Sequence, residues 1–267
     1  MKLGIAYNIF DAEELLEYSI NSIRDFVDYI VVVAQEKSNY GNTNPNLRQT
    51  LKELKDKGLI DLIYWYTPVL KYDEKGNVLS ENGYENEQVK RQIGLNLCEN
   101  YGCKIFSSMD SDELYDKKQY ELAKNDFING DYDSSFCQMK TFYKNAEYQI
   151  IPLETYYVPL FYKIDKNTKF TFEFIPPYPV KIDPTRRIKA GHCLIHTRDE
   201  IEMYHYSYVR KSIETKIENS SARNEQKITN SIINHYNNFN KITDGALFID
   251  NRLVDLIKVE NKFNIEL

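Results

Sequence analysis

Residues 104–115, KIFSSMDSDELY, decide the fold. An apolar run, KIFSSM, leads into three acidic residues within four positions, Asp110, Asp112 and Glu113. Such a run is typical of a buried strand, so the carboxylates follow the point where the strand ends. In a parallel sheet covered by helices, ligands bind beyond the carboxyl ends of the strands. The stretch therefore predicts a functional site at this edge, with a solvated turn that caps a helix at 117–129 as the alternative.

The residues before this stretch alternate between short apolar runs and amphipathic helical patterns. We expect strands at 2–7, 28–34, 60–66 and 104–110. We expect helices after Asp11, at 46–57 and at 84–101, the last two ending at Gly58 and Gly102. This alternation predicts an α/β fold with a mainly parallel, twisted sheet flanked by helices.

Two of these helices carry more specific expectations. Asp11 can cap the first helix, with Glu14 three positions later as its capping-box partner. The helix at 84–101 is expected to bury an apolar face formed by Val89, Ile93 and Leu97.

The second half of the chain is less regular. Its expected strands are 134–143, 155–164, a short one at 179–182, and 201–207. Its expected helices are 208–219 and 224–239, and 252–260 fits either a late edge strand or a short helix. Prolines within residues 174–187 exclude a helix there.

Composition excludes some classes of function. A net charge of −6 argues against a nucleic-acid-binding protein, whose affinity depends on a basic surface. None of the four cysteines forms a C-x-x-C pair, so buried reduced thiols are expected. No apolar run of about 18 residues or typical secretory leader is evident. We expect a cytoplasmic protein, and peripheral membrane association stays open.

Three stretches carry a resemblance to a known family: LGIAYNIFDAEELLEYSINSI (3–23), DYIVVVAQ (28–35) and NEQVKRQIGLNLCENYGCKIFSSMDSDELY (86–115). They resemble the start of a GT-A-fold glycosyltransferase of the family-2-like kind, in which a helix of the form N-E-x-x-K-R-x-x-G precedes a strand ending in D-x-D. The resemblance covers about the first 120 residues. It implies a GT-A-like domain over 1–200, with a nucleotide-binding half at 1–115 and an acceptor-side half at 116–200. A mostly helical part, 201–267, would pack on the same domain.

A carboxylate-x-carboxylate pair at a strand end can hold a hard divalent cation. The resemblance implies a metal-dependent transferase that moves a sugar from a nucleotide-sugar, most simply a UDP-sugar, to a glycan, a lipid-linked molecule or another hydroxyl acceptor. It implies Mn²⁺ or Mg²⁺ held by Asp112, Asp110 and a late histidine. Contacts to the nucleotide-sugar are implied for Tyr7, Asn8, Gln35, Arg91, Asp110 and Arg210. At Gln35 the chain departs from the many family members that have an acidic residue.

Among the histidines we favour His205, in MYHYSYVRK (203–211), as the third ligand. It precedes Arg210 and Lys211, whose charges would meet a diphosphate. A half-buried, hydrogen-bonded histidine without ligand function is the alternative. His192, His196 and His235 are weaker candidates.

The catalytic base is the least determined part of the sequence. No E-D motif of the family is evident, and Glu173 and Asp183 are the candidates that remain. Lys90 and Arg91 fit either a solvated helix face or a contact to the donor or to the D-x-D carboxylates. Arg186 and Arg187 are further candidates for a phosphate or acceptor contact.

Two other classes of function compete with the transferase. A sugar-1-phosphate nucleotidyltransferase would share the sheet and the metal, but its glycine-rich, arginine-containing loop is absent from AYNIFDAEE (6–14). A non-catalytic sugar-binding protein could use the 22 tyrosines as stacking surfaces.

Overall fold

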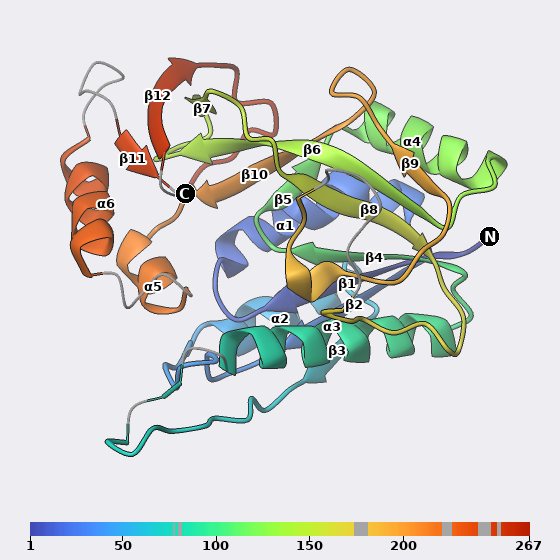
Figure 1. Cartoon of the computed structure of the whole chain (residues 1–267), viewed down its shortest axis with the longest axis horizontal. Helices are drawn as coiled ribbons and strands as arrows, with labels where there is room; N and C mark the ends of the chain where they lie inside the picture. The colour runs from blue at the N-terminus through green and yellow to red at the C-terminus, as the bar shows by residue number, and fades with distance from the viewer. Residues whose placement is uncertain (77, 80–81, 174–180, 221–225, 240–246, 250–251) are drawn as a thin grey trace.

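The structure is a computed structural model that describes residues 1–76, 78–79, 82–173, 181–220, 226–239, 247–249 and 252–267 (Figure 1). The first half contains β1 (Leu3–Ile9), α1 (Glu13–Ile23), η1 (Arg24–Phe26), β2 (Tyr29–Ala34), α2 (Leu47–Asp56), β3 (Leu62–Trp65), α3 (Asn82–Asn100), β4 (Ile105–Asp110) and β5 (Glu113–Tyr115). The second half contains α4 (Lys117–Asn129), β6 (Ser134–Tyr143), β7 (Tyr148–Ile151), β8 (Tyr157–Lys163), η2 (Pro184–Arg186), β9 (Cys193–Ile195), β10 (Glu202–Tyr208), α5 (Ile213–Glu218), α6 (Gln226–Asn238), β11 (Leu247–Ile249) and β12 (Arg252–Lys258).

Four parallel strands form one half of the central sheet, in the order β4–β1–β2–β3. Asn8 of β1 pairs with Asp110 of β4, and the backbone N–H of Gln35 donates to the carbonyl of Ile9 at 3.1 Å. The ends of β4, β1 and β2 thus place Asp110, Asn8 and Gln35 in one row along the carboxyl edge. The expected α/β class, a mostly parallel sheet flanked by helices, is confirmed.

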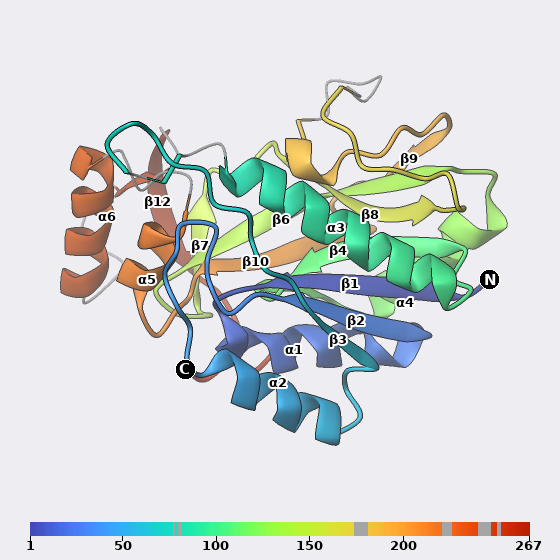
Figure 2. The ribbon, with the colours of Figure 1, turned by 90° about the horizontal axis from the view of Figure 1, so that it is seen from below.

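Helices cover both faces of this half of the sheet. Figure 2 shows α3 over one face and α1 and α2 over the other. Every residue of β1 and of β2 is buried, as the continuous apolar run at 28–34 predicts for a strand covered on two sides.

The predicted apolar face of α3 is wrong at Val89, whereas Leu97 packs against an apolar cluster. Val89 is 46% exposed, whereas Lys90 and Arg91 are almost fully buried. The reason is that the first half of α3 covers a polar cavity instead of the apolar core, and the two cations find partners there. The apolar contact comes later in the helix, where Leu95 and Cys98 pack inward.

Gly94 allows α3 to lie directly on β1, because a Cβ at this position would overlap the Cβ of Ala6 and lie 3.5 Å from Cγ2 of Val33. We expect Gly94→Ala to lower the free energy of unfolding by about 1–3 kcal/mol, since overpacking outweighs the better helix propensity of alanine. Urea unfolding measures this change. Val89→Ala, at an exposed position of the same helix, is the matched control, and equal stabilities of the two variants would contradict the prediction.

The predicted cap of α1 is also wrong. The N-cap position is occupied by Ala12, in a left-handed conformation with φ 60°, and no side chain caps the helix. Asp11 lines the cavity at the carboxyl edge instead, where burial raises the pKa of its carboxyl group above the ordinary value. The expected capping box therefore gives way to a turn that directs Asp11 toward the cavity.

The second half of the chain extends the sheet with strands in both directions. β8 pairs antiparallel with β4 and β6, while β10 lies parallel to β6 and antiparallel to β5. The pairing of β5 with β10 sets His205 opposite Glu113. The strands expected at 134–143, 155–164 and 201–207 are confirmed, whereas β5, β7 and β9 were not expected. The strand expected at 179–182 falls largely outside the described residues.

The C-terminal part combines helices with a strand pair. β12 pairs antiparallel with β7, so residues 252–260 contain a strand and not a helix. α5 is shorter than the helix expected at 208–219, because β10 continues to Tyr208. α5 and α6 pack on Tyr143 and Ile150. Of the helices described here, none has the length and apolar character needed to span a membrane.

Candidate active site

A cavity of about 250 Å³ lies at the carboxyl edge of the parallel strands. Of the residues expected to bind the nucleotide-sugar or the metal, six line it: Asn8, Gln35, Arg91, Asp110, Asp112 and Arg210. They come from the ends of β1, β2 and β4, from α3, and from the segment after β10, so the convergence depends on the whole sheet.

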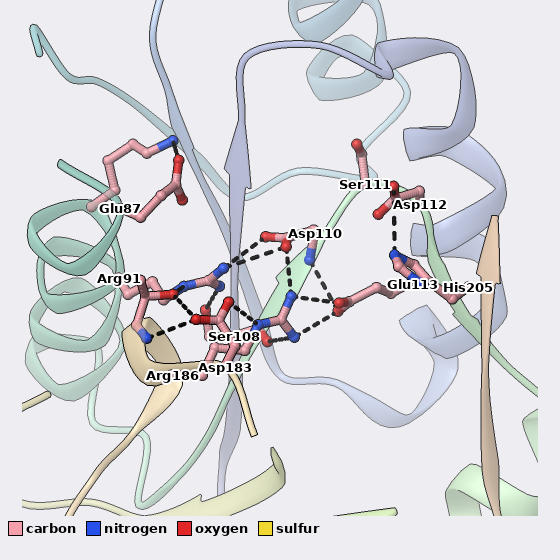
Figure 3. A network of polar contacts seen from close by, with 12 residues as sticks. Glu87, Arg91, Ser108, Asp110, Ser111, Asp112, Glu113, Asp183, Arg186 and His205 are labelled. Atoms are coloured by element: carbon pink, nitrogen blue, oxygen red, sulfur yellow. Dashed lines mark hydrogen bonds and ion pairs between the residues drawn. The ribbon is translucent and has the colours of Figure 1, made fainter. Parts of the chain in front are cut away.

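Asp110 lies between two arginines (Figure 3). Arg91 Nη2 donates to its Oδ1 and Oδ2 at 3.2 and 3.3 Å, and Arg186 Nη2 donates to Oδ2 at 2.5 Å. Burial by itself would raise the pKa of Asp110, but the charges of Arg186 and Arg91 outweigh it and lower this pKa. Asp110 is therefore a carboxylate whose charge is already compensated by the protein.

Glu113 takes part in the same network, although its side chain is buried. Arg186 Nη1 donates to Glu113 Oε2 at 3.1 Å, Arg186 Nη2 donates to Oε1, and the backbone N–H of Asp110 donates to Oε2 at 3.1 Å. Burial, aided by the negative charge of Asp110, outweighs the opposing charge of Arg186 and raises the pKa of Glu113 to about 7. The sequence predicted neither this role of Glu113 nor its contact with Arg186, which lies 73 positions away.

Asp112, directly before β5, lies beside His205 of β10, as Figure 3 shows. His205 Nε2 lies 3.9 Å from Asp112 Oδ2, too far for a hydrogen bond. Burial lowers the pKa of His205, which favours the neutral imidazole that can act as a metal ligand. The structure thus brings these two residues, both expected as metal ligands, close to each other.

Arg210 is the third member of this group. Its Nη2 donates to Asp112 Oδ2 and its Nε donates to the carbonyl of Ser207 at 3.0 Å. Burial raises the pKa of Asp112, but the charge of Arg210 outweighs it and keeps the carboxylate ionised. Arg210 Nη1 is buried and has no hydrogen-bond partner among the described residues. A cationic donor is therefore available to an anion in the cavity.

Two of the expected metal ligands, Asp112 and His205, are close enough to contact one divalent cation, while Asp112 Oδ2 also accepts a hydrogen bond from Arg210 Nη2. Two ligands of one ion, each at about 2.0–2.2 Å, lie at most about 4.4 Å apart, and the Asp112–His205 separation of 3.9 Å is within that limit. In the described part of the chain, no three acidic, histidine or cysteine side chains group closely enough to hold an ion. The remaining ligands would have to be substrate and water oxygens, which is common for Mg²⁺. Asp110 instead pairs with its two arginines.

Tyr7 and Glu173 lie away both from this cavity and from the neighbouring cavities that His205 lines. Tyr7 points to the opposite face of β1 from Asn8, because side chains alternate along a strand; it is fully buried and hydrogen-bonded to Ser19 Oγ at 3.0 Å. Glu173 is exposed, and its backbone N–H donates to Thr171 Oγ1. Among the residues described, neither lines the cavity.

Asp183, by contrast, lies at the junction of two cavities. It lines the cavity at the carboxyl edge and also a smaller one of about 190 Å³ that contains Tyr156 and His205. Its Oδ1 accepts hydrogen bonds from the backbone and side chain of Thr185, and its side chain is 36% exposed. A further cavity of about 360 Å³ shares His205 and Tyr156 with the smaller cavity and is also lined by Lys181.

The other candidate histidines and Arg186 have structural partners. His192 Nδ1 contacts the carbonyl of Asp131 and His235 Nδ1 contacts the hydroxyl of Tyr143. His196 is buried with Nδ1 3.8 Å from Glu200. The guanidinium of Arg186 is paired with Asp110 and Glu113, so Arg186 would affect a substrate only by positioning these two carboxyl groups.

Comparison with known proteins finds distant structural likeness. No protein-family model matches the chain, and no curated protein matches it. The chain is similar to a solved structure of TarS residues 1–349 from S. aureus, at 13% identity and a TM-score of 0.48, over 92% of this chain and 74% of that one. The same TarS segment in complex with UDP-GlcNAc gives 13% identity and a TM-score of 0.47, over 89% and 72%.

A third solved structure is a mannosyltransferase from Pyrobaculum calidifontis in complex with GDP-Man and Mn²⁺. Its identity is 13% and its TM-score 0.34, over 52% of this chain and 35% of that one. All three likenesses have TM-scores below 0.5, so none of them carries an argument about function. The assignment of function depends on the geometry of the cavity.

Proposed function

We propose that the chain is a metal-dependent glycosyltransferase that transfers a sugar from a nucleotide-sugar, a UDP-sugar in the first instance, to a hydroxyl group of a glycan or lipid-linked acceptor. The observation that carries the proposal is the Asp112–His205 pair, 3.9 Å apart, beside Arg210 at the carboxyl edge of a parallel sheet. This edge is where α/β folds bind nucleotides.

The charge of the cavity supports a metal-bound diphosphate. Its carboxylates outnumber its cations: Asp11, Glu87, Asp110, Asp112 and Asp183 against Lys90, Arg91 and Arg210. A bare diphosphate would meet net repulsion in such a site. Asp112 and His205 would hold a Mn²⁺ or Mg²⁺ ion, and a bound ion would neutralise the charge that develops on the departing nucleoside diphosphate. Arg210 Nη1 would donate to a phosphate oxygen.

The acceptor would enter from the side of His205 and Tyr156, where the two further cavities lie. Asp183 stands between these cavities and the donor side, and its carboxylate is partly exposed. We therefore propose Asp183 as the general base, which would take the proton of the acceptor hydroxyl as its oxygen attacks the sugar carbon and the nucleoside diphosphate leaves. Glu173 is not supported in this role.

The proposal predicts metal-dependent binding and turnover of a nucleotide-sugar. Thermal unfolding of the full chain with UDP-sugars should show a rise in the midpoint temperature with Mn²⁺, because ligands that bind only the folded state stabilise it. Excess chelator should abolish the rise. Release of UDP from the donor, with or without an acceptor, should follow the same metal dependence.

Three outcomes separate the alternatives. Equal stabilisation in excess chelator would remove the metal from the proposal. Metal-dependent binding without any release of UDP across a panel of sugars and hydroxyl acceptors would favour a non-catalytic sugar-binding protein. Formation of a nucleotide-sugar from a sugar 1-phosphate and UTP would favour a nucleotidyltransferase.

A further inference from the structure

Asp183, the proposed base, directly precedes the short helical turn η2, which other parts of the fold keep in place. Arg91 of α3 donates to Thr185 Oγ1 at 3.2 Å, and the hydroxyl of Tyr162 in β8 donates to the carbonyl of Arg186 at 3.1 Å. The side chains of Thr185 and Arg186 are both buried. The position of Asp183 relative to the sheet is therefore fixed through η2.

Thr185 lies between Arg91 and Asp183, and the direction of its hydrogen bonds follows from these charged partners. A guanidinium can only donate, so the hydroxyl oxygen of Thr185 accepts from Arg91 Nε. The hydroxyl hydrogen is then left for Asp183 Oδ1 at 2.9 Å, since an ionised carboxylate can only accept. The three side chains thus form one chain in which each hydrogen bond has a single possible direction.

The two carboxylate oxygens of Asp183 have different surroundings. Oδ1 accepts hydrogen bonds from both the hydroxyl and the backbone N–H of Thr185, at 2.9 and 2.8 Å. Oδ2 lies 4.0 Å from Arg186 Nε and accepts no hydrogen bond from the residues that the structure describes. Because Asp183 lines both the cavity at the carboxyl edge and the smaller one beside Tyr156, Oδ2 is the oxygen available to take a proton from an acceptor.

A helix cap alone explains only part of this arrangement. Asp183 is the N-cap of η2, and a cap requires only the hydrogen bond from the backbone N–H of residue 185. That bond would remain with any side chain at this position. The hydroxyl of Thr185 adds a second donor to the same oxygen and ties it to Arg91 of α3. Two donors restrict the rotation of the carboxylate more than one donor does.

We propose that Thr185 is the positioning residue of the base: its hydroxyl holds Asp183 Oδ1 and leaves Oδ2 to take the proton. This inference rests on the proposed function and adds how the base is oriented. Oδ2 takes the proton of the acceptor hydroxyl while the hydroxyl oxygen bonds to the sugar carbon, and the nucleoside diphosphate leaves with the electron pair of the broken bond. Because Arg91 also donates to Asp110, the same chain of hydrogen bonds connects the base with the end of β4.

Initial rates of UDP release from a UDP-sugar, with Mn²⁺ and with water or an added hydroxyl acceptor, test the proposal. Thr185→Val keeps the shape of the side chain and removes its hydroxyl, so kcat should fall about 10- to 100-fold, as a misplaced reacting group can cause. Thr185→Ser keeps the hydroxyl and should restore most of the rate. The KM for the UDP-sugar and the calorimetric affinity for UDP should not change in Thr185→Val. A loss transmitted through Arg91 to the donor side would instead weaken the binding of UDP.

The double variant Thr185→Val/Asp183→Asn distinguishes positioning from general damage to the structure. If Thr185 acts through Asp183, the double variant should be no slower than Asp183→Asn alone, because the base is already lost. Losses that multiply in the double variant would overturn the positioning role. Thr185→Ala removes the hydroxyl without placing a methyl group against the carboxylate, and it takes the place of Thr185→Val if thermal unfolding shows that the latter does not fold.

Thr168→Val is the matched control, because Thr168 Oγ1 donates to Asp165 Oδ1 at 3.0 Å in an exposed turn. This variant loses the same kind of hydrogen bond and should keep the wild-type rate. A wild-type rate in Thr185→Val, or equal losses in Thr185→Val and Thr185→Ser, would overturn the role of Thr185 alone. Absence of UDP release by the wild-type protein, or a wild-type rate in Asp183→Asn, would instead contradict the proposed function and its base.

Discussion

Asp112→Asn should reduce donor turnover on the order of 100-fold or more while the protein still folds. Mutating a residue that only hydrogen-bonds to a metal ligand often lowers activity by about 10–100-fold, and a ligand itself should matter at least as much. Asparagine keeps the shape of the side chain and can still accept a hydrogen bond from Arg210. It loses the charge that would hold a divalent cation. Initial rates of UDP release at saturating Mn²⁺ measure the effect, and thermal unfolding reports the fold.

His205→Ala belongs to the same experiment. If both residues hold one ion, either substitution disables it, so the double variant should be little worse than the worse single variant. His196→Ala, at another buried histidine, is the control and should retain turnover. If His205→Ala keeps near-normal rates and the same Mn²⁺ dependence while Asp112→Asn is inactive, His205 is not a ligand.

The strand ends at the site could be predicted because periodicity and apolar runs are local properties. The buried run at 104–109 places Asp110 and Asp112 at the carboxyl edge without reference to the rest of the chain. His205 could be associated with Asp112 only through the family resemblance. The distance of 3.9 Å between them comes from the pairing of β5 with β10, about 90 positions later.

Other features of the site could not be predicted, because they depend on partners that are distant in sequence. Lys90 and Arg91 break the apolar pattern of α3, and their burial follows from carboxylates on a different part of the fold. Arg186, in a proline-rich segment, was expected as a candidate for a phosphate or acceptor contact. Its place between Asp110 and Glu113 requires the contact of α3 and β4 with η2.

Arg186→Met should be the most destabilising substitution near the site, with a loss of about 3–5 kcal/mol in the free energy of unfolding. Arg186 is buried and donates to both Asp110 and Glu113, so its removal leaves the buried Glu113 without a cation and Asp110 with Arg91 alone. Methionine fills much of the same volume, which separates the loss of charge from the loss of packing. Urea unfolding with linear extrapolation measures the change.

Arg187→Met is the matched control at the next position, where the guanidinium makes a hydrogen bond of 3.4 Å to the carbonyl of Phe172. It should cost about 1 kcal/mol or less, as an isolated hydrogen bond usually does. A loss in Arg186→Met as small as that of Arg187→Met would show that Asp110 and Glu113 do not depend on Arg186.

The double variant Arg186→Met/Glu113→Gln then tests the cause of the loss. Replacing Glu113 removes the buried carboxyl group that Arg186→Met leaves uncompensated, so the double variant should recover part of the stability. Recovery of stability should not restore nucleotide binding to the same extent, because Asp110 would still lack one of its two arginines and its position in the cavity depends on both. The double variant would then regain stability without regaining nucleotide binding. This result is expected only if Arg186 both compensates buried charge and positions the carboxylate at the end of β4.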